Sequence, residues 1–177
     1  MWALTITCVL SAAMSVVGAG TAHAGLMQFE NGFEGDQSTS WESDSAGDGS
    51  AGIEINSGNA RTGANNGWVR GQFGGASEKT WVYTAGVPNV AGAGCVAQIY
   101  VRPRLRTTLV LEIWTPSGGK RYSVDRTVDG GGWQRVYTDR WPLFGEQNMQ
   151  FRIVLHGSGD AGVNWVRLDD LVMQCYW

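Results

Sequence analysis

The chain has 177 residues, and its 13 lysine and arginine residues against 16 aspartate and glutamate residues give a formal net charge of −3. This length supports one domain with a hydrophobic core and is short for two domains. The basic residues are scattered along the sequence rather than clustered, which argues against a nucleic-acid-binding surface.

The N-terminal segment has the composition of a signal peptide. No charged side chain occurs between Trp2 and Ala24, and the segment ends in AHA, a small-x-small pattern that precedes cleavage sites. Thr, Ser and Gly interrupt its apolar run, which suits a cleaved leader better than a transmembrane anchor. We therefore expect a signal peptide over 1–24, cleavage before Gly25, and a single secreted domain over 25–177 without a membrane span.

The mature chain shows period-two alternation of apolar and polar residues, and no long segment has helical spacing. Gly, Asn, Asp and Pro separate the alternating segments, while the Ser/Asp/Gly-rich segment Gln37–Ser50 is expected to be a surface loop anchored by Trp41. About ten short antiparallel strands with turns between them predict an all-β fold, a β-sandwich jelly roll. The predicted strands are Leu26–Glu30, Gly52–Asn56, Gly67–Phe73, Thr80–Thr84, Cys95–Arg102, Thr107–Thr115, Tyr122–Thr127, Trp133–Thr138, Met149–His156 and Asn164–Met173.

The alternation also predicts which side chains point away from the core. In Thr107–Thr115, leucine and isoleucine residues share one face, whereas Glu112 and Trp114 share the other. Three further strands likewise turn aromatic, amide and arginine side chains outward. We expect the inward faces to hold Met149, Phe151, Ile153 and Leu155 of Met149–His156, Cys95, Ala97, Ile99 and Val101 of Cys95–Arg102, and Val69 and Phe73 of Gly67–Phe73. Gln150, Arg152 and His156 are expected to face outward. Pyranose rings stack on aromatic side chains, and their hydroxyl groups bind planar polar partners. We therefore expect one glycan-binding sheet face, formed by Trp68, Arg70, Gln98, Tyr100, Glu112, Trp114 and Arg152.

The residues available for catalysis are few. Of the two histidines only His156 lies in the mature chain, so few residues are available for a catalytic triad or for a metal site of His and Cys ligands. P-loop and dinucleotide-binding signatures are absent, and no catalytic residue is predicted. Glycosidase chemistry needs only two carboxylates, so Glu112 with a second acid leaves a small polysaccharide-active hydrolase or lyase as an alternative. The other alternative is a cell-surface structural or protein-interaction domain that uses the sandwich as a scaffold.

Two cysteines remain after removal of the leader, which carries Cys8. An even number of cysteines in a chain that reaches an oxidising compartment favours a disulfide between Cys95 and Cys175. Two free buried thiols are the alternative. The disulfide would tie a central strand to the last strand.

Three segments carry motifs in a defined order. They are FENGFEGDQSTSW (Phe29–Trp41), ARTGANNGWVRG (Ala60–Gly71), and GWQRVYTDRWPL (Gly132–Leu143) followed by NWVRLDDLVM (Asn164–Met173). In order and spacing, across nearly the whole mature chain, they resemble the β-jelly-roll carbohydrate-binding modules of the family 4, 9 and 22 type, within the galactose-binding-like group. The resemblance implies non-catalytic binding of a polysaccharide or other glycan. Such modules usually accompany a catalytic domain, so a separate secreted enzyme is a further candidate partner.

The same resemblance implies a structural calcium ion. These modules commonly hold calcium near an N-terminal glutamate and a C-terminal aspartate pair, which here are Glu34 and Asp169 or Asp170. Backbone carbonyls between Arg61 and Asn66 would complete the site, because calcium takes about six to eight hard oxygen ligands. The alternative is that the two aspartates only pair with arginines or cap a turn.

Overall fold

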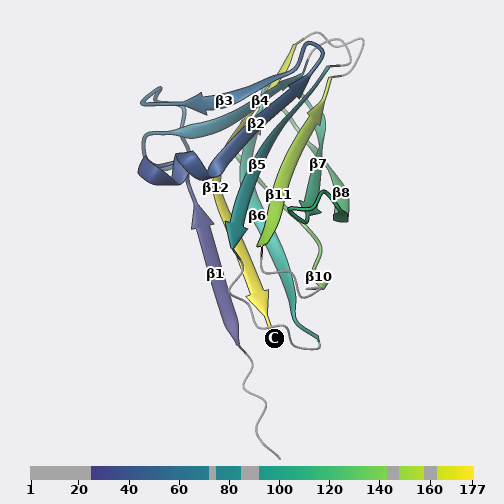
Figure 1. The fold of residues 1–177 in the computed structure, drawn as a ribbon. Coiled ribbons are helices and arrows are strands. Elements are labelled where there is room, and N and C mark those ends of the chain that lie inside the picture. The colour runs from purple at the N-terminus through teal and green to yellow at the C-terminus, as the bar shows by residue number, and fades with distance from the viewer. Residues whose placement is uncertain (1–24, 72–74, 85–91, 143–147, 158–162) are drawn as a thin grey trace, which may run out of the picture.

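The computed structural model describes residues 25–71, 75–84, 92–142, 148–157 and 163–177, so the predicted signal peptide lies outside the described residues. The described part is a sandwich of two antiparallel sheets (Figure 1). Its elements are, in chain order, β1 (Leu26–Asn31), the 3-10 helix η1 (Gly35–Ser40), β2 (Trp41–Ala46), β3 (Ser50–Glu54), β4 (Asn66–Gly71), β5 (Ala76–Thr84), β6 (Gly94–Pro103), β7 (Thr107–Trp114), β8 (Lys120–Val128), β9 (Gln134–Tyr137), β10 (Trp141–Pro142), β11 (Asn148–His156) and β12 (Asn164–Tyr176).

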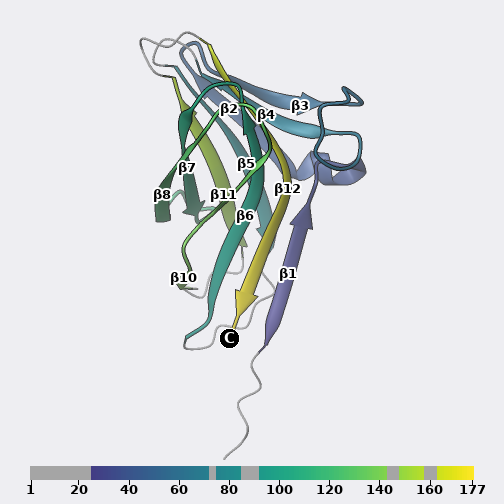
Figure 2. The ribbon, with the colours of Figure 1, turned by 180° about the vertical axis from the view of Figure 1, so that it is seen from behind.

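The two sheets have seven and five strands. The first sheet has the strand order β10-β6-β12-β4-β3, with β1 also paired to β12 and β9 to β6. The second sheet has the order β2-β5-β11-β7-β8. Seen from behind, β12 lies between β1 and β6 (Figure 2). The predicted all-β jelly-roll sandwich is confirmed, with two strands more than the ten expected from the sequence.

The core fills the space between the sheets with the apolar faces that the alternation predicts. Leu109, Leu111 and Ile113 of β7 are fully buried, and so are the alternate residues of β11 and β6. Burying each of these side chains stabilises the fold by roughly 1.5–3 kcal/mol relative to exposure. The confirmed inward residues of β11 and β6 are Met149, Phe151, Ile153 and Leu155, and Cys95, Ala97, Ile99 and Val101. Phe73, predicted on the same face as the buried Val69, lies outside the described residues.

The predicted loop Gln37–Ser50 instead contains the end of η1, the edge strand β2 and the first residue of β3. The sequence signal fails because β2 reads WESDSA and exposes every residue after Trp41, so no apolar alternation is present. Main-chain pairing with β5 holds the strand in the sheet. Trp41 is an anchor as expected: it is buried, its Nε1 donates a 2.8 Å hydrogen bond to Asn31 Oδ1, and its ring stacks on Phe33.

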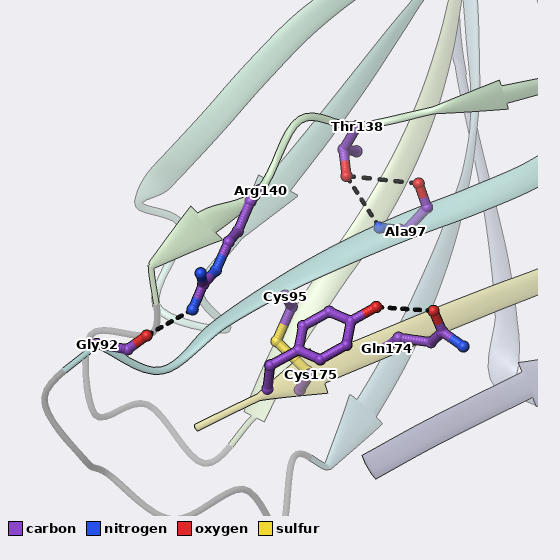
Figure 3. The surroundings of a disulfide bond; sticks show 8 residues. Gly92, Cys95, Ala97, Thr138, Arg140, Gln174 and Cys175 are labelled. Atoms are coloured by element: carbon purple, nitrogen blue, oxygen red, sulfur yellow. Dashed lines mark hydrogen bonds between the residues drawn. A yellow bond between two sulfur atoms is a disulfide. The ribbon is translucent and has the colours of Figure 1, made fainter. Parts of the chain in front are cut away.

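The predicted disulfide is present between Cys95 and Cys175 (Figure 3). The two cysteines face each other in the β6–β12 ladder, so the bond ties a strand in the middle of the first sheet to the last strand. Both cysteines are fully buried. The chain after β9 is held against β6 nearby, where the Ala97 main-chain N–H donates to Thr138 Oγ1 at 2.9 Å.

Candidate functional site

The seven residues predicted to form one glycan-binding face lie on two sheets. Trp68 and Arg70 belong to β4, and Gln98 and Tyr100 to β6, both in the first sheet; the other three belong to β7 and β11 of the second sheet. The outer faces of a two-layer sandwich point in opposite directions, so the seven do not form the single face that the sequence predicts. Alternation assigns a residue to a face of its strand and carries no information about which sheet the strand joins.

The second sheet keeps three of the predicted residues together around Trp114. Its indole Nε1 donates a 2.6 Å hydrogen bond to Glu112 Oε2, two residues earlier on β7. Lys120, opposite Trp114 on β8, donates from Nζ to the other oxygen of Glu112 at 3.0 Å. Glu112 is only 9% exposed, and these two donors satisfy its two oxygens. The Glu112 carboxylate is held by Lys120 and in turn fixes the orientation of the Trp114 indole.

Arg152 of β11 extends this group across the sheet. Its guanidinium carbon lies 4.3 Å from the centroid of the Trp114 ring, and its Nη2 donates to Gln150 Oε1 at 2.9 Å. On the other side, its Nη1 lies 3.4 Å from Glu78 Oε1 on β5. Thr80 Oγ1 donates to the same Glu78 oxygen at 3.2 Å. Arg152 thus bridges an aromatic ring, an amide and a carboxylate.

These side chains form one outward-facing group, which we call the second-sheet cluster. It spans four strands and pairs two carboxylates with two cations around one aromatic ring. Sequence reasoning missed four of its members: Gln150 was expected to face outward but was not chosen, and the other three lie outside or at the start of the predicted strands. The members are Glu78, Thr80, Glu112, Trp114, Lys120, Gln150 and Arg152.

A small hollow adjoins the cluster at Glu78. Its volume is about 100 Å³, and it lies between the edge strand β2 and the strands β5 and β11. Its lining residues are Asp44, Ser45, Ala46, Ala76, Ser77, Glu78 and Val154. The surface that carries the second-sheet cluster therefore continues toward the edge of the sheet.

The remaining predicted residues have separate surroundings on the first sheet. Gln98 lines a hollow of about 250 Å³ with Tyr137 and accepts a 3.4 Å hydrogen bond from Arg135 Nη1. The ring of Tyr100 is covered by Arg61, whose guanidinium carbon lies 3.5 Å from the ring centroid. Trp68 stacks on Trp165 with 5.0 Å between ring centroids. The first sheet thus does not offer one continuous aromatic surface of the predicted kind.

The structure brings the predicted calcium ligands to the loop between β3 and β4. A register shift in β12 after Asp169 places both aspartates there, and Asp170 has a left-handed backbone with φ of 48°. Glu34 reaches the same loop, where a Cβ on Gly63 would collide with its side chain. The three carboxylates and the loop are therefore neighbours, as the resemblance implies.

The contacts of these carboxylates are with hydrogen-bond donors. Glu34 Oε1 accepts the main-chain N–H groups of Ala64 and Asn65 at 2.8 and 2.6 Å. Asp169 Oδ2 accepts those of Arg61 and Thr62 at 2.7 and 3.2 Å. A calcium ion requires oxygen lone pairs directed at one point, so a loop that turns N–H groups toward the carboxylates does not fit it.

Arg61 and Thr62 also satisfy Asp170. Arg61 Nη1 donates to Asp170 Oδ2 at 2.5 Å, and Thr62 Oγ1 donates to Oδ1 at 2.5 Å. Asn66, expected to supply a carbonyl, begins β4 and pairs with Glu54 of β3 in the ladder. Among the described residues, no group of three or more His, Cys, Asp or Glu side chains is placed to hold a metal ion. The Arg61 guanidinium group places a positive charge beside Asp170.

Burial sets the electrostatics of this loop. Asp169 is fully buried, and its removal from water raises the pKa of its carboxyl group from 3.8 to about 6. The N–H donors of Thr62 and Arg61 act in the opposite direction, since they stabilise the charged form. The larger effect is burial.

Comparisons with known proteins support the fold. No protein-family model matches the chain, and no curated protein matches it. Among solved structures, a CBM61 module in complex with β-1,4-galactotriose is 16% identical, covers 80% of this chain and 92% of its own, and has a TM-score of 0.56. The chain has the β-jelly-roll fold of carbohydrate-binding modules. The resemblance read from the sequence is thereby confirmed for the fold.

Two further modules with this fold cover most of the chain. A xylan-binding domain of CBM22 is 15% identical, with 82% of this chain and 92% of its own covered and a TM-score of 0.52. A family 11 module from Clostridium thermocellum, in complex with a β-1,3-1,4-mixed-linked tetrasaccharide, is 14% identical, with coverages of 85% and 94% and a TM-score of 0.52. Across the residues described, no helix is long and apolar enough to cross a membrane.

Proposed function

We propose that this protein is a secreted, non-catalytic carbohydrate-binding domain whose ligand lies on the outer face of the second sheet. The observation that carries the proposal is the fixed position of Trp114, whose indole and neighbouring cations are held in place before any ligand binds. An aromatic ring on a rigid sheet loses little conformational freedom on binding. The likeness in fold to modules solved with glycans supports the same ligand class.

The cluster supplies the two kinds of contact that a pyranose needs. The exposed part of the Trp114 ring offers an apolar surface for the C–H face of a sugar. Gln150, Thr80 and Arg152 offer planar or hydroxyl partners for sugar hydroxyl groups. Because the two carboxylates and two cations balance, the site favours neutral sugars.

Export is part of the same proposal. The buried disulfide between Cys95 and Cys175 suits an oxidising compartment. The leader-like segment 1–24 would direct the chain to export. N-terminal sequencing of the protein released by expressing cells should then begin at Gly25. A chain that keeps its first residues after export would contradict cleavage at that position.

Titration of the mature protein with soluble polysaccharides tests the proposal. The three similar modules bind galactotriose, xylan and a mixed-linkage tetrasaccharide. Galactan, xylan and mixed-linkage β-glucan are therefore the polysaccharides to test. Trp114→Ala should weaken binding about tenfold or more, the equivalent of about 1.4 kcal/mol. Tyr137→Ala removes an exposed aromatic ring from the other sheet and is the matched control. Equal affinities of Trp114→Ala and the wild type would exclude this site.

Two alternatives give different results in the same experiments. A polysaccharide hydrolase or lyase would release reducing ends, and Glu112→Gln would abolish the release. A structural or interaction domain would bind no glycan and would sediment as a dimer or heterocomplex. The calcium ion implied by the resemblance stays a prediction, since the carboxylates at the β3–β4 loop fit it poorly, and the binding proposal does not depend on it.

A further inference from the structure

A second hollow, on the opposite sheet, has a different charge. Its volume is about 310 Å³, within the range of about 300–1,000 Å³ that is usual for small-ligand sites. Arginines of β6 and β12 and the segment that follows β6 form its wall, together with one tryptophan. Its lining residues are Arg102, Pro103, Arg104, Gly131, Val163, Trp165 and Arg167. We call it the arginine pocket.

Two of the three arginines in this pocket keep their charge uncompensated. Arg167 is neutralised by Glu54, which accepts its Nε and Nη2 at 2.9 and 3.2 Å. Arg102 and Arg104 are exposed, and no carboxylate of the described residues lies within ion-pair distance of either. In a chain with a net charge of −3, such a pair of free cations in one hollow marks a place for an anion.

Hydrogen bonds with the main chain position the backbone of Arg104 and the side chain of Arg102. The Arg104 N–H donates to the carbonyl oxygen of Trp165 at 2.8 Å, which fixes the chain after β6 against β12. Arg102 Nε donates to the Gly131 carbonyl at 3.0 Å and leaves its terminal nitrogens available. Guanidinium groups bind carboxylates and sulfate esters through paired N–H donors.

Trp165 gives the pocket an aromatic wall. Its ring stacks on Trp68, and the guanidinium carbon of Arg167 lies 5.5 Å from its centroid. In the ladder, Trp68 is opposite Arg167, and Arg167 is opposite Arg102, so one aromatic and two basic residues lie in a row across β4, β12 and β6. Figure 2 shows these three strands side by side. Trp165 is half-buried.

We propose that the arginine pocket binds an acidic sugar unit, one that carries a carboxylate or a sulfate ester, as a second glycan site on the first sheet. Trp165 provides the surface for the sugar ring, and Arg102 and Arg104 bind the anionic group. A single hollow of this size suits one sugar ring, whereas nucleic acids are bound by an extended basic stripe. The second-sheet cluster, with its balanced charges, would take neutral units of the same or another chain.

Binding of polygalacturonate, a uronate polymer, and of dextran sulfate, a sulfate ester, tests the proposal and distinguishes the two anion sources. The wild-type protein should bind at least one of them, and high salt should weaken that binding, since the screening length falls from about 10 Å at 0.1 M to about 3 Å at 1 M. The double variant Arg102→Ala/Arg104→Ala should lose tenfold or more in affinity. Both side chains are exposed, so the variant should fold normally, which an unchanged melting temperature checks.

The control removes the same charge elsewhere. Arg135→Ala/Arg140→Ala deletes two exposed arginines outside the pocket and should bind acidic glycans like the wild type. Equal losses in both double variants would show an unspecific charge effect and overturn the proposal. So would the absence of binding to either acidic polymer at low salt, or tighter binding of a single-stranded oligonucleotide.

Failure of this proposal and failure of the proposed function are separable. Trp114→Ala lies on the opposite sheet and should leave acidic-glycan binding unchanged, while Arg102→Ala/Arg104→Ala should leave neutral-glycan binding unchanged. Loss of acidic-glycan binding in Trp114→Ala would mean that one site takes both ligands and would overturn a second site.

Discussion

The guanidinium carbon of Arg61 lies 3.5 Å from the centroid of the Tyr100 ring, while its Nη1 donates to Asp170. One side chain of the β3–β4 loop is thereby attached both to β6 and to the bulge of β12. The loop has few apolar residues, and this contact holds it against the first sheet.

The first prediction concerns this contact. Arg61→Met keeps an unbranched apolar stem and removes the guanidinium group, and it should lower the free energy of unfolding by about 1–2 kcal/mol. Denaturant unfolding measures the change. Arg106→Met, which removes an exposed arginine from a long surface ion pair with Asp129, is the control and should change the stability by less than about 0.5 kcal/mol.

A second prediction addresses calcium directly. The carboxylates of this loop already accept N–H and O–H donors, so EDTA should leave the melting temperature unchanged and added calcium should not raise it. Differential scanning fluorimetry with and without each addition measures both. A fall in the melting temperature with EDTA that calcium reverses would show that the protein binds calcium and that the loop rearranges around the ion.

The third prediction follows from the raised pKa of Asp169, about 6 in the folded protein. Between pH 4 and 6 the folded state then binds more protons than the unfolded state, so the free energy of unfolding falls as pH rises through this window. Asp169→Asn removes the titration. The stability difference, wild type minus variant, should fall from pH 4 to 6 and stay flat above 7. A difference that rises with pH would show that the N–H donors outweigh burial.

Lys79 carries the fourth prediction. It is 1% exposed on the inner side of β5, donates from Nζ to Ser43 Oγ at 2.7 Å, and burial lowers the pKa of its amino group to about 8. At pH 7 the folded protein must hold this charge out of water, so Lys79→Met should stabilise it by about 1–3 kcal/mol.

The pH dependence of the same residue has a defined sign. Between about pH 8 and 10.5 the unfolded state binds more protons at Lys79, so wild-type stability should rise with pH relative to Lys79→Met. Urea unfolding at pH 7 and pH 10 measures this. Ser43→Ala is the control that removes the hydrogen bond and leaves the charge. If Lys79→Met is less stable than the wild type at pH 7, burial of the Lys79 charge does not destabilise the fold and the prediction is wrong.

The disulfide gives the fifth prediction. Cys95 and Cys175 are 80 residues apart, and closing a loop of that length stabilises a fold by about 4 kcal/mol in the chain-entropy treatment. The double variant Cys95→Ala/Cys175→Ala should therefore melt roughly 10 °C lower. In the native protein both sulfurs are buried, so reductant should act only as the protein unfolds. Rapid thiol labelling of the folded protein after mild reduction would contradict this.

The sequence predicted well which face of its strand each side chain occupies, and it predicted poorly which strands share a sheet. Leu111 and Ile153 were correctly placed inward because side-chain direction is a local property of a strand. Trp68 and Trp114 were placed on one face although they lie on different sheets, because sheet membership depends on pairing between distant segments. Strand β2 was missed because an edge strand exposed over most of its length has no apolar alternation.

The β3–β4 loop shows the same limit at atomic scale. The resemblance correctly brought Glu34 and Asp169 to this loop, because motif order fixes which segments meet. It also implies carbonyl groups directed at an ion, whereas main-chain N–H groups of the loop donate to Glu34 and Asp169, and local backbone angles decide which groups point inward. Arg61 gave no separate signal in the sequence, as its role depends on the positions of Tyr100 and Asp170.

The place of β12 has a consequence for how the molecule forms. This strand pairs with β1, β6 and β4, and among the described residues it alone joins β1, and β4 with its neighbour β3, to β6. The first sheet is therefore incomplete until β12 has been synthesised, and the pairing of β12 with β1 then joins segments that lie far apart in the sequence. Such long-range pairing folds slowly.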